Sequence, residues 1–128
     1  YPLQTVDLRD FSNETFSLIF SGSTMREIID MAFEDAGFTP KILIETAMNH
    51  ALIKLVTKGL SCTIIPESRA LPYINEERIA WFHTVQNLQW EVSFAMRKDT
   101  YLTDAQNYFI KLALEYGKDM ERRFKASI

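Results

Sequence analysis

The sequence predicts an α/β fold of three layers, in which helices flank a mostly parallel sheet. Along the first half of the chain, short apolar segments alternate with longer segments in which apolar residues recur every three or four positions. The first pattern is typical of buried strands and the second of amphipathic helices, and their alternation is typical of a parallel sheet with right-handed crossovers. The chain has 128 residues, of which 47% are hydrophobic. A chain of this size can bury a core without a disulfide or a metal.

The first strand is predicted over residues 16–20 and the first helix over residues 25–36. The helix prediction rests on apolar residues that share one helical face, namely Met25, Ile28, Ile29, Ala32 and Phe33. Thr24 and Glu27 have the spacing of a capping box, so the helix is expected to begin at Thr24. Gly37 is expected to end it, because glycine readily adopts the left-handed conformation that follows many helices.

A second strand is predicted over residues 41–45. A second helix follows from the same apolar spacing, at Met48, Ala51, Leu52, Leu55 and Val56. Gly59 is expected to end this helix. A third strand is predicted over residues 61–65 and is expected to stop at Pro66, because proline cannot donate a hydrogen bond to a neighbouring strand.

The pattern is less regular after the third predicted strand. Residues 67–78 are expected to form a polar loop, and residues 78–84 a strand. Residues 91–97 alternate between apolar and polar side chains, which predicts a half-buried strand. A long helix is predicted over residues 103–120, with Thr103 and Gln106 at its cap, and the tail at 121–128 is expected to fray.

Charge and composition exclude several classes of partner. The net charge is −3, so the chain by itself is not expected to bind nucleic acid, which needs a concentrated basic face. No apolar run approaches the roughly 18 residues of a membrane helix, so no membrane partner is expected. Cys62 is the only cysteine and lies in an apolar run, which predicts a buried thiol and a reducing, cytoplasmic location.

The turn at residues 21–24 is the strongest candidate for a binding site. Its sequence is Ser-Gly-Ser-Thr, and it lies where the first predicted strand ends and the first predicted helix begins. The free N–H groups and the dipole at a helix start attract anions, so this turn is a candidate site for a carboxylate, sulfate or phosphate. Thr46 and Asn49 lie at the matching junction of the second strand and helix. The alternative, that these residues only cap the helices, stays open.

No catalytic or metal site is predicted. His50, His83 and Cys62 do not have the spacing of metal ligands. The acidic residues of the first helix have the spacing of a solvated helix face. Neither a nucleophile elbow nor a phosphate-binding loop motif is present. The chain is therefore expected not to be an enzyme and to need no cofactor.

Several segments together resemble the effector-binding region of LysR-type transcriptional regulators. They are DLRD at 7–10, FSLIFSGSTMREIIDMAF at 16–33, AGFTP at 36–40, LVTKGLSCTIIP at 55–66, WEVSFAMRK at 90–98 and LTDAQNYFI at 102–110. Their order and spacing carry the resemblance, which extends over residues 5–116.

The resemblance implies a lobe like those of periplasmic binding proteins. In this family the effector domain has two α/β lobes joined by two crossover strands, and an N-terminal winged helix-turn-helix domain binds DNA. Residues 1–98 match the second lobe with its return crossover strand, and residues 99–128 match the C-terminal helix, which belongs to the first lobe. The DNA-binding domain and most of the first lobe have no counterpart in this sequence. DNA is therefore expected as a partner only through that separate domain.

The resemblance also implies a small, anionic metabolite as the effector. Carried over by position, the effector-binding residues are Ser21, Gly22, Ser23, Thr24, Thr46, Asn49 and Pro66. The family dimerises through the helix at 25–36 and the strand at 41–45. Without the first lobe, the chain is expected to self-associate through residues 25–36 or 103–120. Two alternatives stay open, a lobe of an extracytoplasmic solute-binding protein and a small flavodoxin-like α/β domain.

Overall fold

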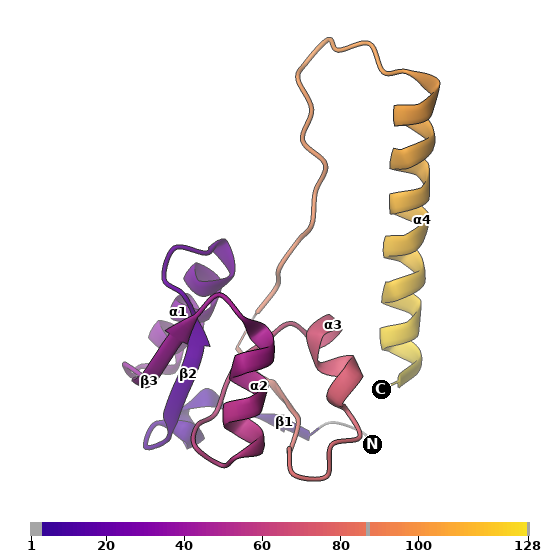
Figure 1. Ribbon diagram of the computed structural model, residues 1–128. Helices are drawn as coiled ribbons and strands as arrows, with labels where there is room; N and C mark the ends of the chain where they lie inside the picture. Colours follow the sequence, from indigo (N-terminus) through magenta and orange to yellow (C-terminus); the bar gives the residue numbers. More distant parts are fainter. Residues whose placement is uncertain (1–3, 87, 128) are drawn as a thin grey trace. The chain divides into compact units, whose positions relative to one another are not determined.

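The structure is a computed structural model that describes residues 4–86 and 88–127, with side chains described as far as residue 123 (Figure 1). The chain divides by packing into two compact units. The larger unit spans Leu3–Trp90, and the smaller comprises residues 1–2 and 91–128. The larger unit contains every strand found among the described residues, and the smaller contains the long helix α4. The division concerns packing alone, so the expected assignment of 1–98 and 99–128 to different lobes stays a prediction.

The centre of the larger unit is a parallel pair of strands, β2 (Thr15–Ile19) and β3 (Lys41–Thr46), joined by the helix α1 (Thr24–Ala36). Thr15 aligns with Lys41 and Ile19 aligns with Thr46, with a shift of register on the way. Parallel pairing around an intervening helix confirms the predicted α/β class. Both strands end at the same edge of the sheet, which is where the helices begin.

The apolar face of α1 packs on β2 and forms the main core. Phe16, Leu18 and Phe33 are almost fully buried, and the rings of Phe16 and Phe33 meet edge to face with their centroids 5.0 Å apart. Burial of each such side chain contributes about 1.5–3 kcal/mol. The other buried members of this core are Leu8, Ile19, Ile29, Ala32 and Ala36.

α1 begins at Thr24 as predicted, but its N-cap differs from the prediction by one residue. Ser23 is the N-cap, since its Oγ accepts a hydrogen bond from the N–H of Arg26 at 3.1 Å and its backbone is extended. Thr24 is the first helical residue, so the predicted capping box that begins at Thr24 is wrong. Gly37 ends the helix as predicted, with a left-handed φ of 77°.

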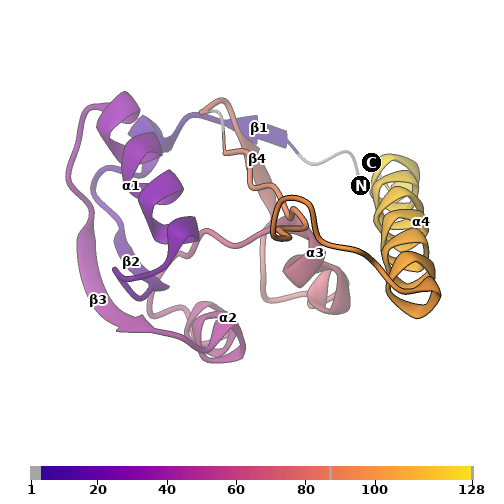
Figure 2. The same ribbon diagram turned by 90° about the horizontal axis from the view of Figure 1, so that it is seen from above.

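The second helix, α2 (Asn49–Thr57), follows Met48 and ends just before Lys58 and Gly59. In Figure 1, α2 lies in front of the β2–β3 pair and α1 lies behind it, and Figure 2 shows the same arrangement from above. The predicted three layers are therefore present. Leu52 and Ile53 are the buried residues of α2.

The predicted third strand at 61–65 is reduced to one isolated parallel bridge between Cys62 and Phe16. The N–H of Cys62 donates to the carbonyl of Thr15 at 2.8 Å, and the N–H of Ser17 donates to the carbonyl of Cys62 at 2.9 Å. The pairing stops after Cys62, and at Pro66 the chain turns into a short helix, α3 (Glu67–Ala70). The direction of this segment is as predicted, but its ladder does not form.

Residues 67–84 also differ from the predicted loop and strand. After α3 comes a 3-10 turn, η2 (Leu71–Tyr73), which accommodates Pro72 because the first turn of a helix needs no N–H from it. Only Phe82–Thr84 forms a strand, β4, and it pairs in parallel with an unpredicted strand, β1 (Gln4–Val6). A second 3-10 turn, η1 (Leu8–Phe11), follows β1.

The smaller unit contains the helix α4 (Asp104–Ser127). Its predicted cap is confirmed, because the N–H of Gln106 donates to Oγ1 of Thr103 at 3.3 Å and the N–H of Thr103 donates to Oε1 of Gln106 at 2.9 Å. The helix continues well beyond residue 120, so the predicted fraying is wrong as far as Ser127. This tail is rich in lysine, glutamate, arginine and alanine, which favour helix. Ile128 lies outside the described residues.

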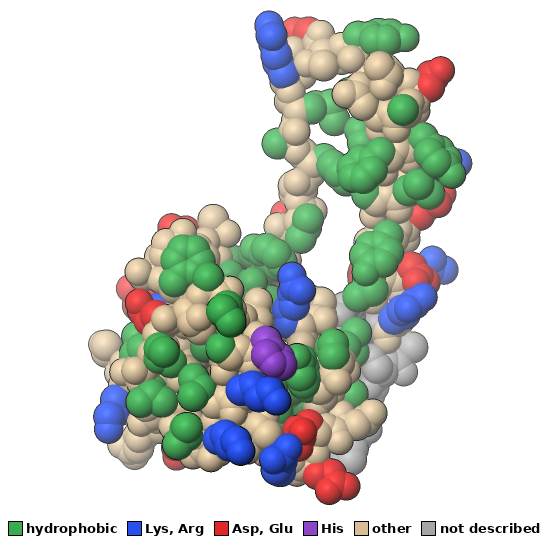
Figure 3. All heavy atoms as spheres, viewed as in Figure 1, with side chains coloured by type: hydrophobic (Ala, Val, Ile, Leu, Met, Phe, Trp, Pro, Cys, Tyr) green, Lys and Arg blue, Asp and Glu red, His purple; other side chains and the backbone are tan. Residues whose placement is uncertain are grey.

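Residues 91–97 are extended, but no strand among the described residues pairs with them, and all of them are exposed. The half-buried strand predicted there is therefore not observed, since burial of one face requires a layer against it. Figure 3 shows apolar side chains gathered along this segment and along α4. The rings of Phe94 and Phe109 meet edge to face, with their centroids 6.2 Å apart.

Candidate functional site

The candidate site lies at the edge of the sheet where β2 and β3 end. Ile19 and Thr46 are aligned in register, and the N–H of Phe20 donates to the carbonyl of Thr46 at 3.1 Å. The turn at 21–24 and the residues that lead into α2 therefore start from adjacent points of the sheet. The structure thus brings together two parts of the predicted site, as parallel strands with short connections require.

Hydroxyl groups surround the start of α1. Ser21, Gly22 and Thr24 are exposed and Ser23 is half-buried. Of these four residues, only Ser23 uses its side chain in a hydrogen bond with another described residue, as the cap on Arg26. The hydroxyls of Ser21 and Thr24 are therefore free to bind a ligand, and the helix dipole adds about half a positive charge at this point.

Gly22 allows the turn to pass close to an aromatic ring. A Cβ atom at this position would lie 2.9 Å from Cε2 of Phe20, which is too close for two carbon atoms. A larger residue at position 22 would force the exposed Phe20 ring to move. The glycine therefore sets the shape of the turn, while the residues beside it supply its hydroxyl groups.

Thr46 and Asn49 form the second part of the site. Oγ1 of Thr46 accepts a hydrogen bond from the N–H of Met48 at 3.1 Å, which closes the turn between β3 and α2. Asn49 is the first residue of α2, and Met48 provides no side-chain cap. The buried Oδ1 of Asn49 has no hydrogen-bond partner among the described residues. Because an unpaired buried acceptor costs about 1–3 kcal/mol, this oxygen favours a donor from outside.

Pro66 is the third predicted part of the site. It is the N-cap of α3 and is half-buried. It lies four residues beyond Cys62, as Phe20 lies four residues beyond Phe16, and Cys62 and Phe16 are bridged in parallel. The third segment therefore runs toward the same edge of the sheet. Proline has no N–H to donate, and the carbonyl of Pro66 accepts a hydrogen bond from the N–H of Arg69 at 2.8 Å.

Arg26 belongs to this region, although it is not among the site residues predicted from the sequence. Its guanidinium is 7% exposed. Nη1 donates to the carbonyl of Ile19 at 2.9 Å and to Oε1 of Glu45, and Nε donates to Oδ1 of Asp30 at 2.7 Å. Burial by itself lowers the pKa of Arg26, but the hydrogen bonds to Asp30 and Glu45 outweigh it and raise the pKa. Arg26 therefore stays charged and ties α1 to the ends of β2 and β3.

A sequence signal for Arg26 was present. A positive side chain in the first turn of a helix is unfavourable for the helix dipole, so such a residue is expected to have another partner. Here the partners are the two carboxylates and the carbonyl of Ile19, which accept from Nε and Nη1 of the guanidinium. The exposed hydroxyls of Ser21 and Thr24 and the backbone N–H groups of the helix starts are the neutral groups at this edge. They suit a small molecule that is held by several hydrogen bonds.

The histidines and the cysteine lie in separate contacts. Nδ1 of His50 is 2.8 Å from the hydroxyl of Tyr73, and Nε2 of His83 is 3.7 Å from Oε1 of Glu67. Burial raises the pKa of the Cys62 thiol, with a smaller contribution from the charge of a nearby glutamate. The described residues contain no group of histidine, cysteine and acidic side chains that could hold a metal ion.

Comparison with known sequences identifies relatives among bacterial regulators. Residues 2–118 match the family model described as the LysR substrate binding domain. The HTH-type transcriptional regulator CzcR of Bacillus anthracis is 24% identical over 115 residues, which are 88% of this chain and 40% of that protein. The HTH-type transcriptional regulator GltR of Bacillus subtilis (strain 168) is 29% identical over 105 residues, 80% of this chain and 35% of that protein. The chain thus spans less than half the length of these curated relatives.

A solved structure shares the fold. The effector binding domain of QuiR in complex with shikimate aligns with a TM-score of 0.68 and 24% identity, over 93% of this chain and 57% of that chain. This likeness confirms the predicted periplasmic-binding-protein-like fold. Among the described helices, none has the length and apolar character needed to span a membrane. Because the family match extends over nearly all of its residues, the chain belongs to the LysR substrate-binding domain family.

Proposed function

We propose that this chain is the effector-sensing part of a LysR-type transcriptional regulator and that its ligand is a small hydroxylated carboxylate. The residues proposed to bind it are those at the β2–β3 edge and at the start of α3, namely Ser21, Gly22, Ser23, Thr24, Thr46, Asn49 and Pro66. The family consists of ligand-binding regulatory domains, which supports a sensing role and not a catalytic one.

One observation carries this proposal, namely that two helices begin at the ends of adjacent parallel strands. α1 starts after β2, α2 starts after β3, and the last paired residues of these strands are Ile19 and Thr46. Each helix start has unpaired N–H groups and a positive dipole end, which favour a carboxylate. The hydroxyl of Ser21 and the side chain of Asn49 suit the hydroxyl groups of such a ligand. Shikimate, the ligand of the QuiR domain, has both kinds of group.

The same proposal includes the behaviour of the whole regulator. A ligand that binds more tightly to one arrangement of two lobes shifts the equilibrium toward that arrangement. We also propose that a separate domain of the regulator binds DNA and that the regulator is cytoplasmic. It is proposed to dimerise through α1 and β3. The exposure of β3 supports the dimer, because Leu43 and Ile44 are 52% and 46% exposed although they lie in an apolar strand.

A thermal-shift screen tests the ligand class. The longest form of the protein that its gene encodes would be heated with shikimate, other small carboxylates, phosphate, sulfate and amino acids. A ligand that binds the folded form should raise the midpoint temperature in a concentration-dependent way. We expect Ser21→Ala to weaken the binding of that ligand severalfold, because one net hydrogen bond contributes about 0.5–1.5 kcal/mol.

Ser12→Ala is the matched control, because it removes an exposed hydroxyl at the end of η1, away from the β2–β3 edge. It should leave the affinity unchanged. If none of the tested classes shifts the midpoint temperature, the proposed ligand class is wrong. If Ser21→Ala and Thr46→Val both bind the ligand as tightly as the unchanged protein, the proposed site is wrong.

A further inference from the structure

The larger unit contains a second, separate pair of parallel strands. β1 and β4 align Gln4 with Phe82 and continue to Val6, whose carbonyl accepts a hydrogen bond from the N–H of Val85 at 2.9 Å. The boundaries between the two units fall close to this pair, since the larger unit spans Leu3–Trp90. β1 and β4 therefore lie near the two ends of the larger unit in the sequence.

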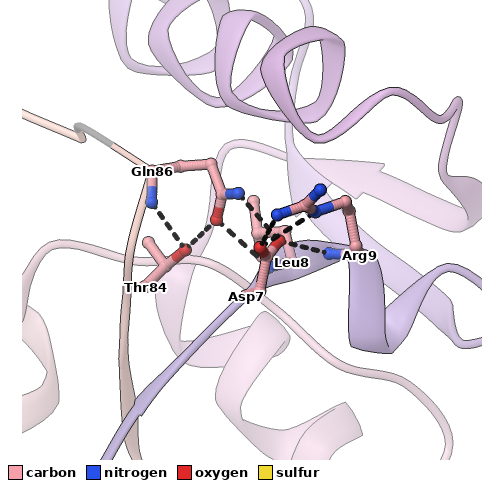
Figure 4. A network of polar contacts seen from close by, with 5 residues as sticks. All are labelled: Asp7, Leu8, Arg9, Thr84 and Gln86. Atoms are coloured by element: carbon pink, nitrogen blue, oxygen red, sulfur yellow. Dashed lines mark hydrogen bonds and ion pairs between the residues drawn. The ribbon is translucent and has the colours of Figure 1, made fainter.

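A buried glutamine joins the segments that follow these strands (Figure 4). Gln86 is 7% exposed. Its Oε1 accepts hydrogen bonds from the N–H of Leu8 at 3.1 Å and from the hydroxyl of Thr84, and its Nε2 donates to Oδ1 of Asp7 at 2.9 Å. Because two donors meet the oxygen, the orientation of the amide is fixed and its nitrogen faces the carboxylate.

Asp7 and Leu8 connect this network to the rest of the lobe. Asp7 caps η1, since its Oδ1 accepts from the N–H of Arg9 at 3.0 Å and its Oδ2 accepts from Nε of Arg9 at 2.9 Å. Leu8 is buried in the core that α1 covers. Gln86 therefore ties the last segment of the lobe to the first one, and through Leu8 it ties both to the core.

Backbone pairing alone is a weak connection between these two segments. β1 and β4 have 3 residues each, and a two-stranded ribbon of this length is at best marginally stable by itself. The side-chain network adds hydrogen bonds that link residues 78 and 79 positions apart in the sequence. Removal of the Gln86 amide would leave the N–H of Leu8 without its hydrogen-bond partner. An unpaired buried N–H destabilises the folded state, so this change should weaken the connection between the two segments.

We propose that Asp7 and Gln86 form a clamp between the segment that enters the lobe, residues 4–8, and the segment that precedes its exit, residues 82–86. The clamp makes the lobe rotate as one rigid body about the two connections that join it to the rest of the protein. The proposal rests on the proposed function, because this movement matters only if ligand binding changes the arrangement of two lobes. Neither residue lies at the β2–β3 edge, so both are positioning residues. They affect the range over which the lobe moves and not the chemistry of what it binds.

Distances between spin labels, measured by pulsed electron paramagnetic resonance, test the clamp. The measurement uses the longest form of the protein that its gene encodes, without ligand and with Cys62→Ser to remove the native thiol. One label pair joins the lobe to α4 through Glu34→Cys and Lys118→Cys. A second pair lies within the lobe, through Glu34→Cys and Lys58→Cys. These label positions are all exposed.

Gln86→Leu should broaden the distance distribution of the first pair and leave that of the second pair unchanged. Gln86→Glu keeps an acceptor for the N–H of Leu8 but places a second oxygen against the Asp7 carboxylate, so it should also broaden the first distribution at pH 8. Ser61→Ala is the matched control, because it removes a side-chain hydrogen bond of 2.7 Å to Ser17 in the same lobe without touching the clamp. It should leave both distributions narrow.

The proposal is overturned if Gln86→Leu or Gln86→Glu leaves the first distribution unchanged. It is also overturned if Ser61→Ala broadens that distribution to the same extent, or if both label pairs broaden together. Those results would mean that the glutamine only stabilises the lobe. Because no ligand is present in this experiment, its outcome is independent of the thermal-shift screen, and the failure of one proposal can be distinguished from the failure of the other.

Discussion

The two units carry the same kind of amphipathic pattern but differ in what covers their apolar faces. In the larger unit, Phe16 and Phe33 are each 2% exposed, because they lie between α1 and the sheet. In the smaller unit, Phe109 of α4 is 63% exposed and Val92 of the preceding segment is 81% exposed. Helical or alternating spacing therefore predicts which face is apolar, whereas burial depends on a second layer. Within the described residues, only the larger unit has that layer.

The largest expected difference between the units concerns the loss of a phenylalanine. Phe33→Ala should lower the free energy of unfolding by about 3–5 kcal/mol, because the ring is buried against Phe16 and a cavity would remain. Phe109→Ala should lower it by less than about 1 kcal/mol, because its ring is mostly exposed. Urea unfolding of both variants, followed by circular dichroism, measures the two changes. Equal losses would contradict the difference in packing.

The second prediction concerns what the exposed face of the smaller unit does in solution. We expect the 128-residue chain to self-associate at tens of micromolar, because exposed apolar stripes of this size favour contact with another surface. Phe109→Glu should weaken the association by about tenfold to a hundredfold, since burial of one large side chain contributes about 1.5–3 kcal/mol. Sedimentation velocity measures the association.

Lys111→Glu is the matched control for this second prediction, because it also places a carboxylate on the exposed surface of α4. It should leave the association close to that of the unchanged chain. A monomeric chain whose α4 amides are protected from hydrogen exchange would mean that the helix finds a partner surface within its own chain. In that case the proposed self-association is wrong.

The fold could be predicted wherever one segment carries enough residues to show a period. The periods of α1 and α2, and the apolar segments of β2 and β3, each span one continuous segment, and all four elements were predicted. β1 has 3 residues and pairs across the chain, Gln4 with Phe82, so it shows no pattern of its own. Of the strand predicted over residues 78–84, only Phe82–Thr84 forms, as β4. The segment at 91–97 shows the opposite case, since it alternates clearly and yet has no layer to bury it.

The candidate site could be predicted only in part. Residues at the ends of parallel strands follow from the topology, and both the strand-to-helix pattern and the family resemblance selected residues 21–24, Thr46 and Asn49 among them. The burial of Arg26 between Asp30 and Glu45 could not be predicted from spacing, because Glu45 belongs to a different element. The network of Asp7 and Gln86 was not predicted for the same reason, since its members are 79 positions apart.

The third prediction tests which residue caps α1. Ser23→Ala should lower the free energy of unfolding by about 1 kcal/mol, because it removes the acceptor for the N–H of Arg26. Thr24→Ala should have a smaller effect, because Thr24 is already helical and makes no capping hydrogen bond. The comparison is well matched, since each variant removes one hydroxyl from the same turn. A larger loss for Thr24→Ala in urea unfolding would restore the capping box predicted from the sequence.

The smallest expected effect appears only in acid and concerns the clamp in the larger unit. The pKa of Asp7 lies well below its ordinary value of 3.8, first because of the side-chain hydrogen bonds from Arg9 and then because of the Arg9 N–H and Gln86. A carboxyl whose pKa is lower in the folded state stabilises that state above its ordinary pKa, and the stabilisation is lost as the pH falls below it. The ionised Asp7 should therefore contribute fully at neutral pH.

Urea unfolding at a series of pH values measures this contribution, with Asp7→Asn as the reference that cannot titrate. The difference in unfolding free energy between the unchanged chain and Asp7→Asn should be constant near neutral pH and should shrink once the pH falls below 3.8. Arg9→Gln removes the largest cause of the lowered pKa, so it should make the contribution of Asp7 depend less on pH. A difference that stays constant down to the lowest accessible pH would mean that Asp7 contributes through its shape and not through its charge. The clamp would then need only the hydrogen bond from Gln86, which an asparagine oxygen at position 7 can also accept.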